Sequence, residues 1–116
     1  MTHLRHVLPA RRMSLVRDIG FDGAILTVTV GFHPDGTPGE VFISGGKSGS
    51  GIDALLSDAA ILASLALQHG TPPAALAKSM SRVPTSAYEP ARLPASAIGA
   101  VMDLLAEIAA AGPFGS

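Results

Sequence analysis

The chain has 116 residues and a formal net charge of −1; 47% of its residues are apolar, 15% are charged and none is cysteine. A chain of this length and apolar content supports one domain with one core, which excludes an intrinsically disordered protein. The missing thiols exclude disulfides, cysteine-based metal sites and thiol redox chemistry, and the small net charge excludes a strong overall electrostatic field.

Residues 1–12 are predicted to form a basic, flexible arm ahead of the folded domain. The first 17 residues contain no acid, and their basic side chains are His3, Arg5, His6, Arg11, Arg12 and Arg17. Nucleic-acid binding through this arm is one hypothesis. Because no aromatic residues lie between the arginines, we prefer a solvated tail or a charged guard on a strand edge, and we expect no nucleic-acid partner.

No segment has the pattern of a secretory signal or a membrane-spanning helix. The arm lacks the apolar run of a signal peptide. The longest apolar stretch, residues 52–67, is interrupted by Asp53, Ser57, Asp58 and Ser64, whereas a membrane helix needs about 20 consecutive apolar residues. We therefore expect a cytoplasmic protein with no membrane partner.

Three strands are predicted next, over residues 13–21, 24–32 and 40–44. In the second strand, Leu26, Val28 and Val30 alternate with Ile25, Thr27 and Thr29. This is the period-2 pattern of a strand with one buried face. The Asp-Gly pair at 22–23 is a strong signal for a two-residue hairpin turn. A second turn is expected where the sequence reads His-Pro-Asp-Gly at 33–36.

A helix is predicted from the glycine-rich segment 44–51 to about His69, with Gly70 as its C-terminal stop. The pattern Ser50-x-x-Asp53 fits an N-terminal capping box. At about 100° per residue, the polar side chains at 53, 57, 64 and 68 gather on one side, and nearly everything else is Ala, Leu or Ile. A helix this apolar lies in a core or at a subunit interface, so we expect a homo-oligomer or a protein partner.

Two further helices are predicted after that stop. Thr71 is the expected N-cap of a short helix that ends near residue 81. Residues 82–94 contain three prolines and are predicted to be an ordered loop, and the last helix is expected over about 95–110. The predicted fold class is α+β: a three-stranded antiparallel β-meander followed by two to three helices packed on one face. Residues 13–112 form this single domain.

The predicted core is aliphatic, because the sequence has few aromatic residues and no tryptophan. The side chains expected to be mostly buried are Val28, Val30, Val41, Ile43, Leu55, Leu56, Ala59, Leu62, Ala63, Ala66, Ile98, Met102 and Leu105.

The glycine-rich loop is the candidate ligand-binding site. Its residues Gly46, Lys47, Ser48, Gly49 and Ser50 precede a helix N-terminus, where backbone N–H groups and a lysine favour an anion. The segment is not a P-loop, because Val41 stands where that motif requires glycine. The alternative interpretation, which we prefer, is a turn that caps the helix.

The remaining polar residues predict no metal or catalytic centre. The four histidines, His3, His6, His33 and His69, are scattered over the arm, a turn and a helix end. The sequence contains no Gly-x-Ser-x-Gly nucleophile motif. We therefore expect no catalytic residue, no metal ion and no cofactor, and we lean towards a protein that is not an enzyme.

Three blocks of the sequence resemble a segment of adenosylcobalamin-dependent (class II) ribonucleotide reductases that includes their C-terminal TSCPD-type region. The blocks are residues 35–43 (DGTPGEVFI), 46–50 (GKSGS) and 63–72 (ASLALQHGTP). The whole chain resembles small stand-alone bacterial relatives of that region more closely still. The resembling part covers roughly residues 33–83 and implies a shared fold.

The resemblance does not imply shared catalysis. Reduction in that family requires a cysteine radical and a reducing cysteine pair, and this chain has no cysteine and no TSCPD motif. Only the loop 46–50 and the helix end 64–70 match family positions, so no catalytic residue is carried over.

The leading functional hypothesis is a non-catalytic module, related to ribonucleotide reductase, that binds a protein partner or a nucleotide. Two alternatives remain open. One is a small enzyme that acts on an anionic or phosphorylated ligand at the 45–51 loop, and the other is nucleic-acid binding through the arginine-rich arm.

Overall fold

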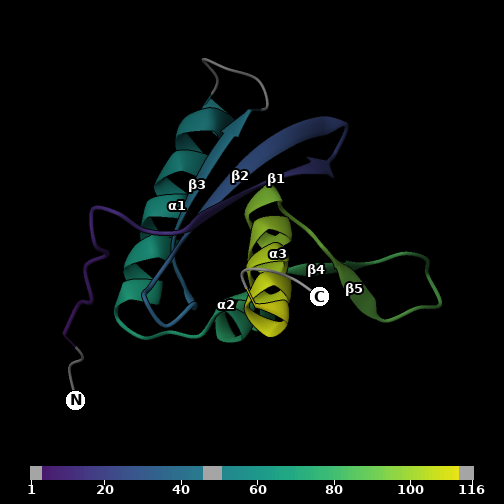
Figure 1. Cartoon of the computed structure of the whole chain (residues 1–116). Helices are drawn as coiled ribbons and strands as arrows, with labels where there is room; N and C mark the ends of the chain where they lie inside the picture. The colour runs from purple at the N-terminus through teal and green to yellow at the C-terminus, as the bar shows by residue number, and fades with distance from the viewer. Residues whose placement is uncertain (1–3, 46–50, 113–116) are drawn as a thin grey trace.

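The computed structural model describes residues 4–45 and 51–112. Its first half is an antiparallel sheet with strand order β1-β2-β3, formed by β1 (Ser14–Phe21), β2 (Ala24–Phe32) and β3 (Pro38–Gly45). Figure 1 shows helices α1 (Gly51–Gln68) and α3 (Ala97–Ala111) lying over this sheet. The predicted α+β fold with a three-stranded meander and helices is confirmed.

The β1–β2 hairpin has the predicted two-residue turn. Asp22 has φ 51° and Gly23 has φ 80°, so both central residues are left-handed, as a type I′ turn requires. The turn sets the register that places Phe21 opposite Ala24 and Leu15 opposite Val30. This register directs alternate β2 residues towards the helices.

The core lies between the sheet and the helices. Among the described residues, fourteen side chains form it: Leu26, Val28, Val30 and Phe32 of β2, Val41 of β3, Leu56, Ala60, Ala63 and Leu67 of α1, Ala77, and Val101, Met102, Leu105 and Ile108 of α3. Only one of them is aromatic, as the composition predicts.

Two predicted core residues are not in the core. Leu55 and Leu62 are each 68% exposed, so their predicted burial is wrong. The side of helix α1 that contains Leu56 and Ala63 faces the sheet. The other side of the helix therefore points outward. Four other predicted core residues, Ile43, Ala59, Ala66 and Ile98, are half-buried.

The predicted loop at 82–94 is instead a small hairpin, β4 (Arg82–Pro84) paired with β5 (Ala91–Pro94). Its base is held by Arg82, whose guanidinium donates to Asp103 of α3 at 2.6 and 2.5 Å and to the Ala77 carbonyl at 2.8 Å. These bonds, of which those to Asp103 are long-range, stabilise strands that have little local sequence signal.

The two later helices differ from prediction at their starts. Helix α2 (Pro73–Ser79) has Pro72 as its N-cap, with no side-chain cap, so the Thr71 cap is wrong. Helix α3 begins after Ser96, whose hydroxyl accepts a bond from the Gly99 N–H at 3.0 Å. Gly112 ends α3 at φ 84°.

Among the described residues one helix, α1, is long and apolar enough to cross a membrane by length and composition alone. A helix of a folded core meets the same two criteria, so the observation is weak evidence by itself.

Candidate functional site

The helix end that carries the family resemblance covers the free edge of β3. Outward-facing backbone groups of β3 belong to alternate residues. Ser64 Oγ accepts a hydrogen bond from the Val41 N–H at 2.9 Å and lies 3.2 Å from the Val41 carbonyl, and Gln68 Nε2 donates to the Gly39 carbonyl at 3.1 Å. The two side chains are one helical turn apart, so they meet successive outward positions of the strand.

Gln68 also fastens the N-terminal arm. Its side-chain carbonyl accepts from Arg5 Nε at 2.6 Å, and its backbone carbonyl accepts from the His6 N–H at 2.8 Å. Farther along the arm, Arg12 pairs with Glu40 of β3. Arg5 and Arg12 of the arm are therefore bonded to residues of the folded domain, which weakens the nucleic-acid hypothesis. The flexibility of the arm stays a prediction.

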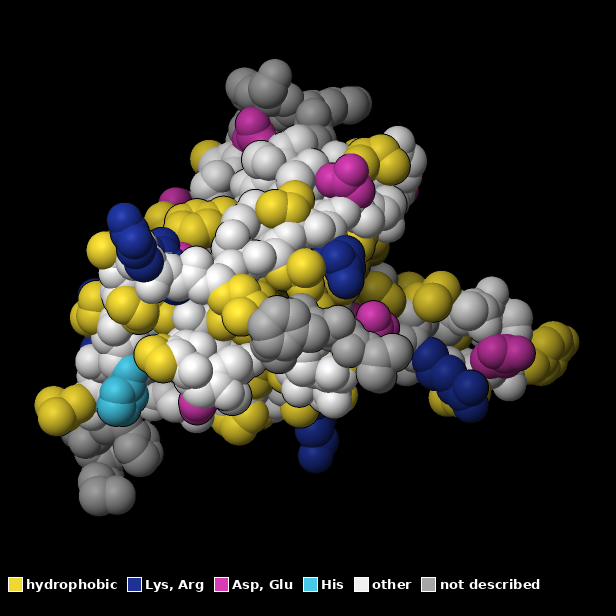
Figure 2. All heavy atoms as spheres, in the orientation of Figure 1, with side chains coloured by type: hydrophobic (Ala, Val, Ile, Leu, Met, Phe, Trp, Pro, Cys, Tyr) yellow, Lys and Arg dark blue, Asp and Glu magenta, His cyan; other side chains and the backbone are white. Residues whose placement is uncertain are grey.

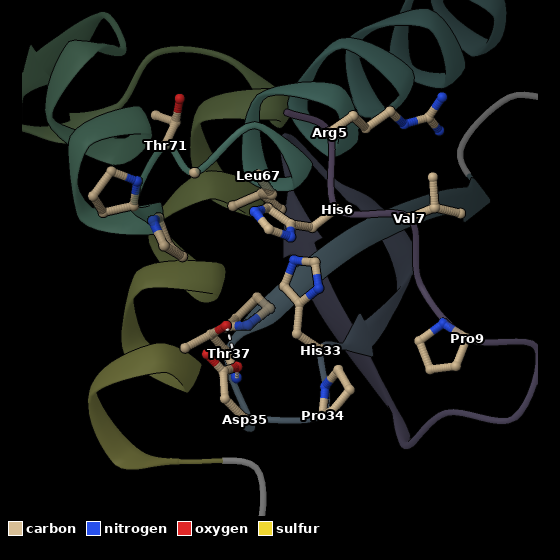
Figure 3. A pocket seen from close by; sticks show the side chains of 14 residues that line it. Arg5, His6, Val7, Pro9, His33, Pro34, Asp35, Thr37, Leu67 and Thr71 are labelled. Carbon is tan, nitrogen blue, oxygen red and sulfur yellow. Dashed lines mark hydrogen bonds between the residues drawn. The ribbon is translucent and has the colours of Figure 1, made fainter. Parts of the chain in front are cut away.

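The arm forms one wall of a cavity of about 930 Å³, called the arm pocket below. Its other walls are the β2–β3 turn and the connection between α1 and α2. Figure 3 shows the imidazoles of His6, from the arm, and His33, from the turn, pointing towards one another. The pocket also contains Asp35, whose pKa is lowered chiefly by hydrogen bonds from the Thr37 hydroxyl and N–H.

The outward side of α1 is apolar. Its outer face is defined here as Leu55, Asp58, Ile61, Leu62 and Leu65; all but the half-buried Leu65 are exposed. Figure 2 shows hydrophobic side chains on the surface in the region of α1, at the left of the view.

A groove of about 370 Å³ adjoins the outer face where α1 meets β3, lined in part by Phe42, Ile43, Ile61 and Leu65. Phe42 is 55% exposed. The apolar surface therefore continues from the helix onto the neighbouring strand.

The predicted anion site, Gly46, Lys47, Ser48, Gly49 and Ser50, lies outside the described residues. So does His3. Of the other histidines, His69 lies elsewhere, with Nδ1 2.8 Å from the Leu65 carbonyl. No group of three or more potential metal ligands occurs within 4–45 and 51–112.

Sequence reasoning found one of these features and missed another. The polar side of α1 that contains Ser64 and Gln68 was visible as a cluster at helical spacing. The presence of His6 and His33 in one pocket had no sequence signal, because it depends on how the arm crosses the β2–β3 turn.

Comparison with known proteins finds similar sequences. The model of a family described as the TSCPD domain matches residues 8–109. A vitamin B12-dependent ribonucleotide reductase of Rhodopirellula baltica is 38% identical over 68 residues, which are 59% of this chain and 6% of that protein. The chain thus spans a small part of the curated relative it matches. No solved structure matches the chain.

Proposed function

The chain belongs to the TSCPD domain family, and on that premise we propose that it is a non-catalytic, ribonucleotide-reductase-related module that works by binding a protein partner, a second copy of itself. The absence of cysteine supports the non-catalytic part, because the resemblance implies cysteine radical chemistry that this chain has no thiol to perform. The exposed outer face of α1 supports the partner.

Four residues of the outer face, together with His69 just after the end of α1, have the spacing of a helix-pairing seam. Leu55, Asp58, Leu62, Leu65 and His69 follow one another at intervals of three and four residues, the heptad spacing of side chains that meet a partner helix. Leu55 and Leu62 in this seam are large apolar side chains that are each 68% exposed, and such residues gathered on one face mark a candidate interaction site. This seam is the observation that carries the proposal.

The seam is self-complementary when two α1 helices run antiparallel. In two antiparallel helices, the position numbers of residues that face each other have a constant sum. If Leu62 of one copy faces Leu65 of the other, Asp58 of each copy therefore faces His69 of the other copy. Both Asp58 and His69 are exposed. A twofold axis then repeats each contact, as in an isologous dimer.

The seam alone is too small for a stable dimer. A helix of 18 residues is about 27 Å long and about 10 Å wide, giving roughly 300 Å² of outer face. Stable interfaces bury about 800 Å² per partner. The groove that contains Phe42 and Ile61 lies beside the seam, and we include it in the proposed interface.

Sedimentation equilibrium of the full chain tests the proposal. We expect a dimer for the natural chain and a folded monomer for Leu62→Glu, because the substitution places two charges in the apolar centre of the interface. Val16→Glu is the matched control: Val16 is 56% exposed on β1, away from α1, and this variant stays dimeric. The proposal would be refuted if the natural chain stays monomeric when the protein concentration is raised to about 100 times the lowest concentration that the assay can measure.

A further inference from the structure

The arm pocket brings two histidines together from segments far apart in the sequence. His6 comes from the arm and His33 from the β2–β3 turn, while α1 contributes Leu67 and the α1–α2 connection contributes Thr71 and other uncharged residues. Figure 3 shows both rings directed into the space between these segments. The pocket is separate from the outer face of α1.

Backbone hydrogen bonds fix where the two rings start. The His6 N–H donates to the Gln68 carbonyl at 2.8 Å, and the His33 N–H donates to the Thr37 carbonyl at 2.8 Å. Gln68 is buried and is itself bonded to β3. The positions of both histidines therefore depend on the folded core and not on the arm alone.

A glycine makes room for the His33 ring. A Cβ atom at Gly39 would lie 2.7 Å from His33 Nε2 and 2.8 Å from Leu8 Cδ2, both closer than real contacts allow. With glycine there, the imidazole and the arm can both approach the strand. The ring is thereby held at the wall of the pocket.

Among the described residues, three of the four titratable groups that line the pocket are basic. The titratable or charged groups that line the pocket are Arg5, His6, His33 and Asp35. One Asp35 oxygen accepts from the Thr37 N–H at 2.9 Å and from the Thr37 hydroxyl at 2.6 Å. The Arg5 side chain points away from the imidazoles (Figure 3), towards Gln68. Two facing imidazoles that are both protonated repel each other, and an oxyanion between them removes that repulsion.

We propose that the arm pocket binds a small phosphate-bearing molecule, with the phosphate held between His6 and His33. The rest of the pocket suits an uncharged body, because Leu67 and the prolines at 34, 38, 72 and 73 line it. Its volume of about 930 Å³ is within the range of small-molecule sites, about 300–1,000 Å³. A nucleoside monophosphate fits this description better than inorganic phosphate does.

Calorimetric titration of the full chain with AMP, inorganic phosphate and inorganic sulfate, at pH 6 and pH 8, tests the proposal. We expect AMP to bind more tightly than inorganic phosphate. Sulfate stays a dianion at both pH values, whereas phosphate loses charge near pH 6, so we expect sulfate to bind about tenfold more tightly at pH 6, since imidazoles gain their charge between about pH 5 and 8. Equal sulfate affinity at the two pH values would overturn the role of the histidines.

Variants locate the site. His6→Gln and His33→Gln should each weaken AMP binding at pH 6 about tenfold or more, the loss of one charge-assisted hydrogen bond. His6 is exposed on the arm, so its substitution leaves the core intact. Lys78→Gln, which removes an exposed cation of α2, should change nothing. Binding that survives both histidine substitutions but is lost in Lys47→Ala would assign the phosphate to the glycine-rich loop and overturn the proposal. Binding of Zn²⁺ but not of AMP would overturn it in favour of a metal site.

Discussion

Replacing Ser64 with alanine tests whether the helix end that resembles the reductases acts by covering the edge of β3. The Ser64 hydroxyl accepts the Val41 N–H at 2.9 Å and lies 2.8 Å from the Ala60 carbonyl, to which it donates. Val41 is 1% exposed, so removal of the hydroxyl leaves a buried N–H without a partner, at a cost of about 1–3 kcal/mol. Alanine recovers about 0.5 kcal/mol of helix propensity.

The expected net loss is therefore about 1.5 kcal/mol. Unfolding entropy is about 2.1 cal/mol/K per residue, or roughly 0.24 kcal/mol/K for a chain of this length. The melting temperature should fall by about 6 °C, and exchange of the Val41 amide hydrogen should accelerate.

Ser79→Ala is the matched control. Its hydroxyl also donates to the carbonyl four residues earlier, Ala75, at 2.8 Å, but it is exposed and touches no strand. We expect this variant to melt at or slightly above the natural temperature. Equal melting temperatures for Ser64→Ala and Ser79→Ala would refute the reasoning that Ser64 stabilises the sheet edge.

Two further predictions concern the hairpin and the β2–β3 turn. Arg82→Ala should accelerate limited proteolysis within residues 85–90, because it removes the bonds to Asp103 and Ala77 that hold the base of the hairpin. Arg92→Ala is the control. Equal cleavage rates for the two variants would contradict this role of Arg82. Thr37→Val should raise the pKa of Asp35 back towards its ordinary value of 3.8, measured by NMR titration of the carboxyl. Because Asp35 has a lowered pKa in the folded chain, its contribution to stability is present above pH 3.8 and is lost as the pH falls through the lower folded pKa. An unchanged Asp35 pKa in Thr37→Val would show that the bond from the Thr37 hydroxyl does not cause the lowered pKa.

The meander was predictable because its signals are local. The Asp-Gly pair at 22–23 sets the type I′ turn, and the alternation in β2 needs only its own residues. The β4–β5 hairpin was not predictable in the same way, because Arg82 finds Asp103 only after α3 packs against α2.

The sequence correctly predicts a long apolar helix, but it does not predict which side of that helix is buried. Its composition predicts contact on most sides, and the sequence cannot say which side meets the sheet and which side stays exposed. Ser64 and Gln68 decide this, because they must reach the outward groups of β3. Once they do, Leu55 and Leu62 point outward.

Disulfide cross-linking at Leu62 is the most direct test of the proposed dimer. The chain has no cysteine, so Leu62→Cys, Leu65→Cys and the control Val16→Cys each introduce a single thiol. In the antiparallel seam Leu62 of one copy faces Leu65 of the other, so mild oxidation of an equimolar mixture of Leu62→Cys and Leu65→Cys should give more covalent dimer in denaturing electrophoresis than either variant alone, while Val16→Cys stays monomeric. Cross-linking of the mixture that does not exceed that of the separate variants or of Val16→Cys would contradict the account.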